Sequence, residues 1–321
     1  MKKLCPRTID PPFVMLDSHK NLLTTDKAIE DRALEVYKER LSNNEMKPHL
    51  IKAEKTVNKL NEQRLKITKL NRREPWSLAD LENAIKDIGR DKARDALGMA
   101  NELFKEEAAG TDFKLSILKL MNLIKKQSNF PRIMELCNIT SIYKNKGSHK
   151  DFDSYRGIFR VTVLRSILDR MIYNDNYWVI DKNLTDGNVG ARKDRNVRDN
   201  IFVMNAISNS VINGQMPPIQ ISVTDVKKCF DKLWLQSTIN ALYEAGLTNH
   251  TLNILYAENK NAKVSIKING KLTKRVPVRD VVMQGSVWGS MKCTTTMDKL
   301  NKTMLKEDNL RYHYKNYLTY Q

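Results

Sequence analysis

Several features that would narrow the function are scarce or absent in this sequence. The four cysteines, Cys5, Cys137, Cys229 and Cys293, are too far apart for a Cys-x-x-Cys zinc pair and suggest no disulfide framework, which indicates reduced intracellular thiols. The five histidines are scattered as well, and a lone one such as His149 is more often a surface residue than a ligand. With no long apolar span and no signal-peptide segment, we expect no membrane partner and a protein of the nucleus or cytoplasm that is not secreted.

Acidic residues are in deficit. Asp and Glu total 37 against 55 Lys and Arg, which gives a formal charge of +18. Such an excess favours a phosphate-rich partner or an anionic membrane surface, and nucleic acid is the better fit because no membrane segment accompanies it. The 321 residues are 41% hydrophobic, which suffices for a core and for two or three lobes.

The segment from Ile219 to Trp234 predicts a strand that ends at a carboxylate and then turns into a helix. Side chains alternate along a strand, so Asp225 would extend an apolar row that includes Ile221 and Val223. A buried, unpaired carboxylate is costly, so Asp225 is expected to open onto a cleft, to meet a cation or to pair with a base. The alternative is that Asp225 only caps the following helix.

Other patterns predict helices. Ser77 and Asp80 form a plausible N-terminal cap for a short helix that ends near Gly89. A second apolar stripe runs from Phe113 to Ile124, and a third from Val161 to Ile172. Residues 1–74 contain a helical pattern from Ala33 to Leu41, and then many Lys and Arg. We expect a linker or arm there, either solvated or gripping nucleic acid.

Strands are predicted at two places. Asn138 to Tyr143 is a short candidate, and Lys263 to Val282 has the alternation of a hairpin with Asn269-Gly270 as its turn. The hairpin delivers Gln284-Gly285 to the expected cleft, where glycine permits a close backbone approach; the alternative is a simple tight turn before a helix.

Two of these segments match palm motifs of one family. Asp225-Val-Lys-Lys-Cys-Phe-Asp231 and Gln284-Gly-Ser-Val-Trp-Gly-Ser290 resemble the reverse transcriptases of non-LTR retrotransposons, and the resemblance runs from about Pro75 to the C-terminus. It implies that Asp225 ligates magnesium with help from the carbonyl of Val226. It also implies that Phe230 discriminates against a ribose 2′-hydroxyl, and that Gln284 and Gly285 lie beside template and nucleotide.

Upstream segments resemble the fingers of that family. Tyr155-Arg-Gly-Ile158 is similar to a Tyr-Arg-Pro-Ile motif whose arginine grips the triphosphate, with Gly157 in place of proline. Arg156, with Lys144 and Lys146 before it, is thereby a candidate nucleotide ligand, since arginine offers a planar donor fork to phosphate. The segment from Gly190 to Ile201 resembles the family's Gly-Phe-Arg-Lys-Gly-Arg segment. Its candidates for contact with the template backbone are Arg192, Lys193, Arg195 and Arg198.

One family feature is missing. The second pair of palm carboxylates belongs to an Asp-Asp hairpin, and this sequence has no Asp-Asp pair. Two divalent cations need several carboxylates, so one aspartate cannot hold a two-metal site. We therefore expect Mg²⁺ or Mn²⁺ to act only if the palm is completed, and no polymerase activity from this chain alone.

The resulting hypothesis is an α+β fragment of a right-hand polymerase. Residues 1–74 would be a helical linker or arm, 75–215 a fingers-like region and 216–321 a partial palm. The implied partners are an RNA template, a DNA primer and deoxynucleotide triphosphates. The alternative is a basic RNA- or DNA-binding module without catalysis.

Overall fold

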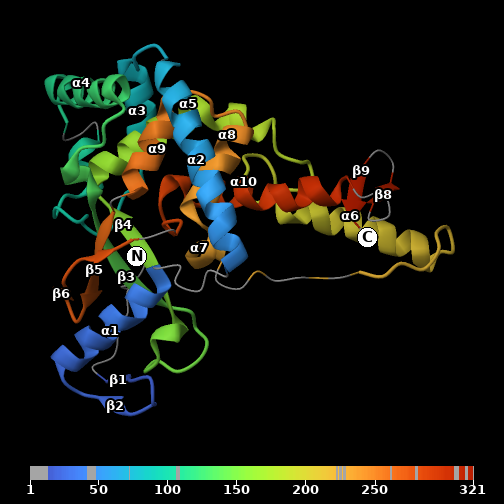
Figure 1. The fold of residues 1–321 in the computed structure, drawn as a ribbon, viewed down its shortest axis with the longest axis horizontal. Coiled ribbons are helices and arrows are strands. Elements are labelled where there is room, and N and C mark those ends of the chain that lie inside the picture. The colour runs from blue at the N-terminus through green and yellow to red at the C-terminus, as the bar shows by residue number, and fades with distance from the viewer. Residues whose placement is uncertain are drawn as a thin grey trace, which may run out of the picture.

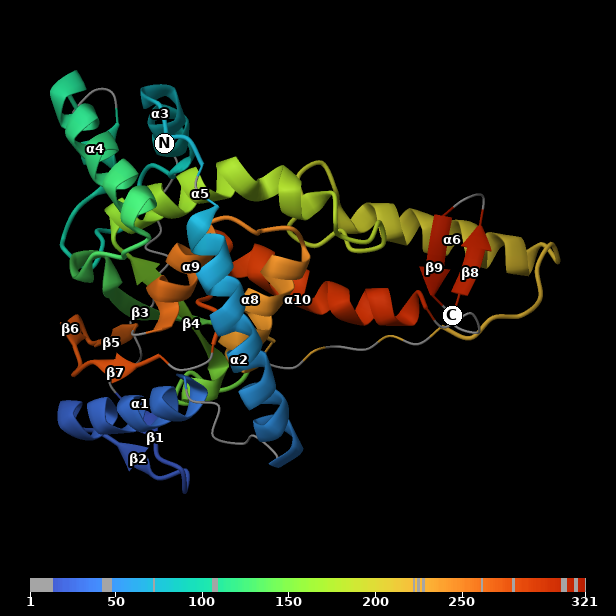
Figure 2. The same cartoon turned by 45° about the horizontal axis from the view of Figure 1, so that its top comes forward.

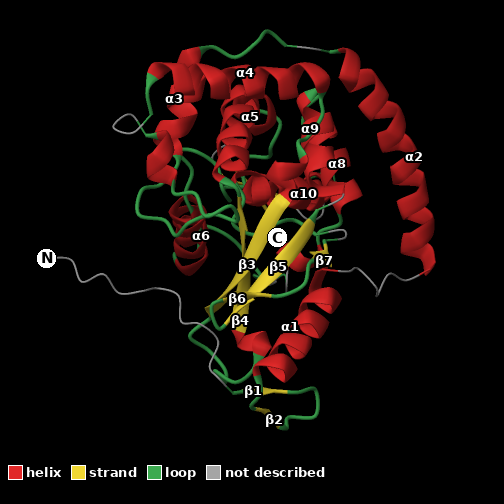
Figure 3. Ribbon diagram, turned by 90° about the vertical axis from the view of Figure 1, so that its left-hand side faces the viewer, coloured by secondary structure: helices red, strands yellow, loops and turns green. Residues whose placement is uncertain are grey.

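The protein combines helices with one mixed β-sheet, as the predicted α+β class requires. In a computed structural model, the structure describes residues 14–41, 48–71, 73–105, 109–221, 223, 226, 229–260, 262–278, 281–306, 311–314 and 317–320. Figures 1 and 3 show the sheet between a group of helices at one end and a single helix at the other.

The central sheet has five strands within these described ranges, in the order β4 (Tyr155–Val161), β3 (Leu136–Tyr143), β5 (Lys263–Ile268) and β6 (Lys271–Leu272), with β7 (Val276–Pro277) also paired to β5. β3 runs parallel to β5 and antiparallel to β4. The strand and the hairpin predicted from sequence are confirmed. The turn residues Asn269 and Gly270 have φ values of 47° and 78°, the left-handed backbone that a two-residue hairpin turn needs.

One core joins the N-terminal region to this sheet. The short strands β1 (Met15–Leu16) and β2 (Leu22–Leu23) lead into α1 (Asp26–Leu41). The apolar side of α1, which includes Ala33 and Tyr37, packs on sheet residues such as Ile139 and Ile266. This part of the expected arm is therefore core structure, and Figure 2 shows α1 lying across the sheet region.

A second core lies among the helices that gather beyond the other end of the sheet (Figure 3). It is formed by α3 (Leu78–Asp87), α4 (Thr111–Gln127), α5 (Val163–Asp181), α8 (Leu235–Glu244), α9 (Thr251–Lys260) and α10 (Val287–Met304). The predicted cap of the first of these is confirmed, because Ser77 and Asp80 form a capping box. α2 (Pro48–Leu70) packs on α8 and α9.

Several elements extend away from the body on one side. α6 (Val197–Ile212) and the C-terminal half of α10 project to the same side of the molecule, as do β8 (Arg311–Tyr314) and β9 (Tyr317–Tyr320) (Figures 1 and 2). Among the described residues, no helix combines the length and apolarity needed to cross a bilayer.

The predicted strand before Asp225 is wrong at the positions that the structure describes. Residues 217–221, 223 and 226 lie in no strand or helix, and the Val223 side chain is 91% exposed. A strand is held by hydrogen bonds to a neighbouring strand, and none of the described strands pairs with this segment. The helix predicted after it is present in short form as α7 (Cys229–Lys232).

Candidate functional site

A cavity of about 560 Å³ lies along β4, the edge strand of the sheet, and we call it the β4 cavity. It brings together segments that are far apart in sequence. Five residues predicted to contact a nucleotide or metal line it, namely Lys144, Arg156, Val226, Phe230 and Gln284. They come from the β3–β4 connection, β4, the segment before α7, α7 itself and the end of the segment after β7.

One wall of the β4 cavity is basic. Among the described lining residues, the charged side chains are Arg40, Lys144 and Arg156 against the carboxylate of Asp153. Arg40 donates to Asp153 at 2.8 Å and to the carbonyl of Phe152 at 2.8 Å. Lys144 donates its ammonium to the carbonyl of Asp153 at 2.7 Å. The wall is thus held in place and keeps an excess of positive charge, which favours an anionic ligand.

Arg156 occupies the exposed side of β4. It lies opposite Ile142 in the β3–β4 register, and its side chain is exposed. The neighbouring Gly157 faces α1, where a Cβ atom would come within 2.8 Å of the Tyr37 ring. Glycine at this position therefore lets α1 approach the strand that carries Arg156.

Phe230, Val226 and Gln284 also line the cavity. The amide of Val282 donates to the carbonyl of Phe230 at 3.2 Å, which ties α7 to the segment that leads to Gln284. The carbonyl of Gln284 accepts from the amide of Phe159 at 2.9 Å, so this segment docks on β4.

Gly285 makes that docking possible. Its φ is 98°, and a Cβ atom there would lie 3.0 Å from Ile158 and 3.2 Å from the carbonyl oxygen of Phe159. Both the left-handed backbone and the close contact favour glycine. α10 begins at Val287, so a helix follows Gln284-Gly285, as both interpretations of this segment require.

Two residues predicted to contact a nucleotide, Lys146 and Gly285, are not part of the described lining. Asp225 lies outside the described residues, so its prediction as catalytic and metal ligand stays a prediction. Lys146 is exposed in the turn between β3 and β4 and does not line the cavity. Val226 lines the cavity, and its side chain is 48% exposed.

The donors that the structure describes do not fit a two-metal centre. Asp153 is the carboxylate among the described lining residues, and it is engaged by Arg40. Within the described ranges, no three His, Cys, Asp or Glu side chains are grouped so that they could hold a metal ion. Asp298 is not a substitute, because it accepts hydrogen bonds from Thr185 and Asn188 and so anchors a loop.

The predicted template-contact segment follows α5 as a loop over residues 182–196, which we call the basic loop. Arg192 points inward, with its side chain 5% exposed and its Nε atom 2.8 Å from Asp181. It also donates to the carbonyls of Thr185 and Asn188. Hydrogen bonding to Asp181 raises the pKa of Arg192. Arg192 therefore holds the loop in shape and does not present its guanidinium to solvent.

The other three predicted residues of this segment are exposed. The ammonium of Lys193 lies 4.7 Å from the centre of the Tyr177 ring and 5.9 Å from that of Trp178. Arg195 pairs with Asp186 at 3.3 Å on the surface, and Arg198 is in the first turn of α6. Trp178 is 62% exposed. The cations can contact a phosphate backbone, and the exposed indole beside them can stack on a base.

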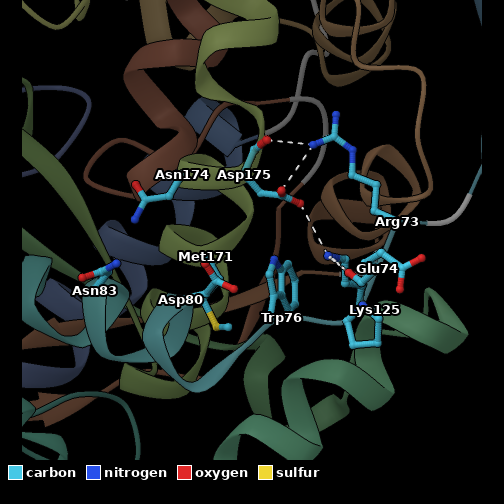
Figure 4. Close-up of a pocket in the computed structure, with 10 residues that line it drawn as sticks. Arg73, Glu74, Trp76, Asp80, Asn83, Lys125, Met171, Asn174 and Asp175 are labelled. Atoms are coloured by element: carbon cyan, nitrogen blue, oxygen red, sulfur yellow. Dashed lines mark hydrogen bonds and ion pairs between the residues drawn. The ribbon is translucent and has the colours of Figure 1, made fainter.

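A second cavity, of about 680 Å³, lies between α3, α4 and α5, and we call it the Trp76 cavity (Figure 4). Its described lining residues include two cations and three carboxylates, so they give no excess of positive charge. Asp175 is 3.3 Å from Arg73 and 3.5 Å from Lys125, whose ammonium lies 4.2 Å from the Trp76 ring centre. No residue predicted from sequence to bind a ligand lines this cavity, so the β4 cavity is the better candidate although it is smaller.

Four ionisable side chains form a buried ion cluster beneath the helices: Arg165, Asp169, Glu258 and Lys292, each at most 3% exposed. Lys292 donates to Glu258 at 2.6 Å, and Arg165 is 3.5 Å from the other oxygen of Glu258. Burial and the nearby carboxylate of Glu258 raise the pKa of Asp169 well above its usual value. Burial opposes ionisation of Glu258 too, but Lys292 and Arg165 outweigh it and lower its pKa to about 2. The cluster joins α5, α9 and α10, so we assign it a structural role.

Sequence reasoning missed two groups of residues. Tyr37, Arg40 and Asp153 line the β4 cavity. Tyr37 and Arg40 belong to α1, which is more than a hundred residues from β4, and no local pattern connects the two elements. Trp178 could have been noticed, because it is an aromatic residue in the last turn of α5, shortly before the basic loop.

No model of a known protein family matches this sequence.

Proposed function

We propose that the β4 cavity binds a deoxynucleoside triphosphate in the manner of a non-LTR reverse transcriptase, and that the chain alone does not polymerise. Arg156 and Lys144 would hold the phosphates, Phe230 would contact the sugar, and Gln284 would lie beside the base. Basic residues of the basic loop would hold the template backbone.

One observation carries this proposal. The residues selected from separate motifs, which span sequence positions 144 to 284, line one cavity together. A set of unrelated surface residues would be scattered over the molecule, whereas an inherited binding site would remain assembled.

The charge of the cavity supports an anionic ligand. Among the described lining residues, three basic side chains against one carboxylate suit a triphosphate, and the aromatic ring of Phe230 offers a surface for a sugar or base. Magnesium would lower the cost of negative charge on the phosphates, but the described donors do not fit a two-metal site.

Titration calorimetry with a deoxynucleoside triphosphate tests the proposal. Arg156→Ala removes a charged donor from the cavity and should weaken binding roughly 10- to 150-fold, because a hydrogen bond to a charged group contributes about 1.5–3 kcal/mol. Inorganic triphosphate serves as a second probe that lacks sugar and base. Its affinity should fall by a similar factor in Arg156→Ala.

The matched control is Arg160→Ala. Arg160 belongs to the same strand and carries the same charge, but its guanidinium donates to the carbonyl of Arg94 and it does not line the cavity. Binding should be nearly unchanged. Equal losses in Arg156→Ala and Arg160→Ala would mean that general positive charge, and not the cavity, attracts the ligand.

A basic nucleic-acid-binding module is the second candidate. It is favoured by the exposed Trp178 beside Lys193, with Arg195 and Arg198 nearby in sequence, since this combination offers both backbone and base contacts. Binding of single-stranded RNA without any affinity for nucleoside triphosphates would support this module and exclude the nucleotide site.

A further inference from the structure

Two cysteines meet at the wall of the β4 cavity. The Sγ atoms of Cys229 in α7 and Cys293 in α10 lie 3.2 Å apart, although 64 positions separate them in sequence. Both are free thiols and both are half-buried. A disulfide has an S–S length of about 2 Å, so a small approach of the two side chains would allow the bond.

The two thiols differ in accessibility. Cys229 lines the β4 cavity, whereas Cys293 does not. Burial and the adjacent Cys229 thiol raise the pKa of Cys293 to about 12. Since the thiolate is the nucleophile, a dissolved reagent should react first at Cys229. Once Cys229 is capped, its own contribution to the raised pKa of Cys293 is lost, which favours the second step.

A metal is a poorer explanation of the pair. Zinc in a structural site takes four ligands, and the described residues offer no third His, Cys, Asp or Glu side chain grouped with these two.

We propose that Cys229 and Cys293 form a reversible disulfide with a low-molecular-weight disulfide, such as oxidised glutathione, as the oxidant. Cys229 attacks the reagent, a mixed disulfide forms, and one glutathione thiolate leaves. Cys293 loses its proton to solvent and attacks the Cys229 sulfur, and the second glutathione leaves. The protein loses two electrons and two protons, and the oxidant is reduced to two thiols.

The bond would fasten α7 to α10 beside the β4 cavity. α7 has four residues and carries Phe230, which lines the cavity, so its attachment fixes one wall. Formation of the bond does not depend on the proposed nucleotide binding, and it is measured by chemistry alone.

The full-length protein is incubated with oxidised glutathione, quenched with acid, alkylated and analysed by intact mass and non-reducing peptide mapping. We expect a species that has lost two hydrogens, a linked pair of peptides containing Cys229 and Cys293, and full reversal by dithiothreitol. Cys293→Ser should instead accumulate glutathione on Cys229. Cys137→Ala is the control, because Cys137 is buried elsewhere, and it should form the linkage as the natural protein does.

Two results would overturn the proposal. The first is stable glutathione on Cys229 of the natural protein without linkage to Cys293, and the second is no reaction at either cysteine under conditions that oxidise a model dithiol. If Cys293→Ser fails to fold, the peptide map of the natural protein still decides, because a linked or an unlinked Cys229 peptide is observed there directly.

Discussion

Neutralising Glu258 should strongly destabilise the protein. Glu258 faces Lys292 at 2.6 Å and Arg165 at 3.5 Å, in a cluster whose members are at most 3% exposed. The change Glu258→Gln preserves shape but leaves two buried cations without their shared carboxylate. Breaking a buried pair in this way costs about 3–5 kcal/mol, and we expect about 3 kcal/mol because Asp169 can ionise in partial compensation.

The assay is denaturant unfolding followed by tryptophan fluorescence, for which Trp288 is a suitable reporter because it is fully buried and donates to the Asp169 carbonyl. The matched control is Glu244→Gln. Glu244 is also near two cations, Lys299 at 2.9 Å and Arg64 at 3.8 Å, but its side chain is 48% exposed. The control should lose about 0–1 kcal/mol.

A double variant separates charge from packing. If an uncompensated buried cation causes the loss, then Glu258→Gln with Lys292→Met should be more stable than Glu258→Gln alone, because one cation is removed. Equal unfolding free energies for Glu258→Gln and Glu244→Gln would refute the reasoning and indicate that water or other groups already screen the cluster.

Four further outcomes are expected. The raised pKa of Asp169 means that the folded state keeps a proton which the unfolded state releases near pH 4. The free energy of unfolding should therefore fall as pH rises from there towards the folded pKa, by up to about 1.4 kcal/mol per pH unit. Asp169→Asn should lack this slope when unfolding is measured against pH. Phe230→Ala should reduce the preference for deoxyribonucleotides over ribonucleotides in competition binding, and an unchanged ratio would make Phe230 a packing residue. Replacing Lys193, Arg195 and Arg198 by alanine should reduce the salt dependence of RNA binding by about one unit per lost contact, and an unaltered slope would place the interface elsewhere. The chain should not extend a primed RNA template with Mg²⁺ or Mn²⁺ in a gel assay, and templated incorporation would disprove the expected lack of activity.

Local patterns predicted local structure well. The capping pair at Ser77 and Asp80 and the Asn269-Gly270 turn depend on neighbouring residues only, and both form as expected. The strand before Asp225 failed for the opposite reason. Its apolar residues satisfy the alternation rule, but a strand also requires a partner, and sequence periodicity does not say whether one is present.

The candidate site was predicted in part. Motif resemblance selected Arg156, Phe230 and Gln284, which line one cavity. It did not select Tyr37 or Arg40, because α1 reaches the cavity through tertiary packing. Nor did it distinguish Arg192 from its exposed neighbours. A basic residue in a basic segment has the same appearance in sequence whether it faces solvent or, like Arg192, a buried carboxylate.

The contact between Gly157 and Tyr37 constrains how such a chain can vary. The Tyr37 hydroxyl is 2.9 Å from that of Ser141, and its ring fills the space that any Cβ atom at position 157 would require. A proline at position 157 and a tyrosine at position 37 should therefore exclude each other. Among homologous chains the two sites should change together, and grafting α1 onto a chain with proline at position 157 should fail unless the tyrosine is replaced by a smaller residue.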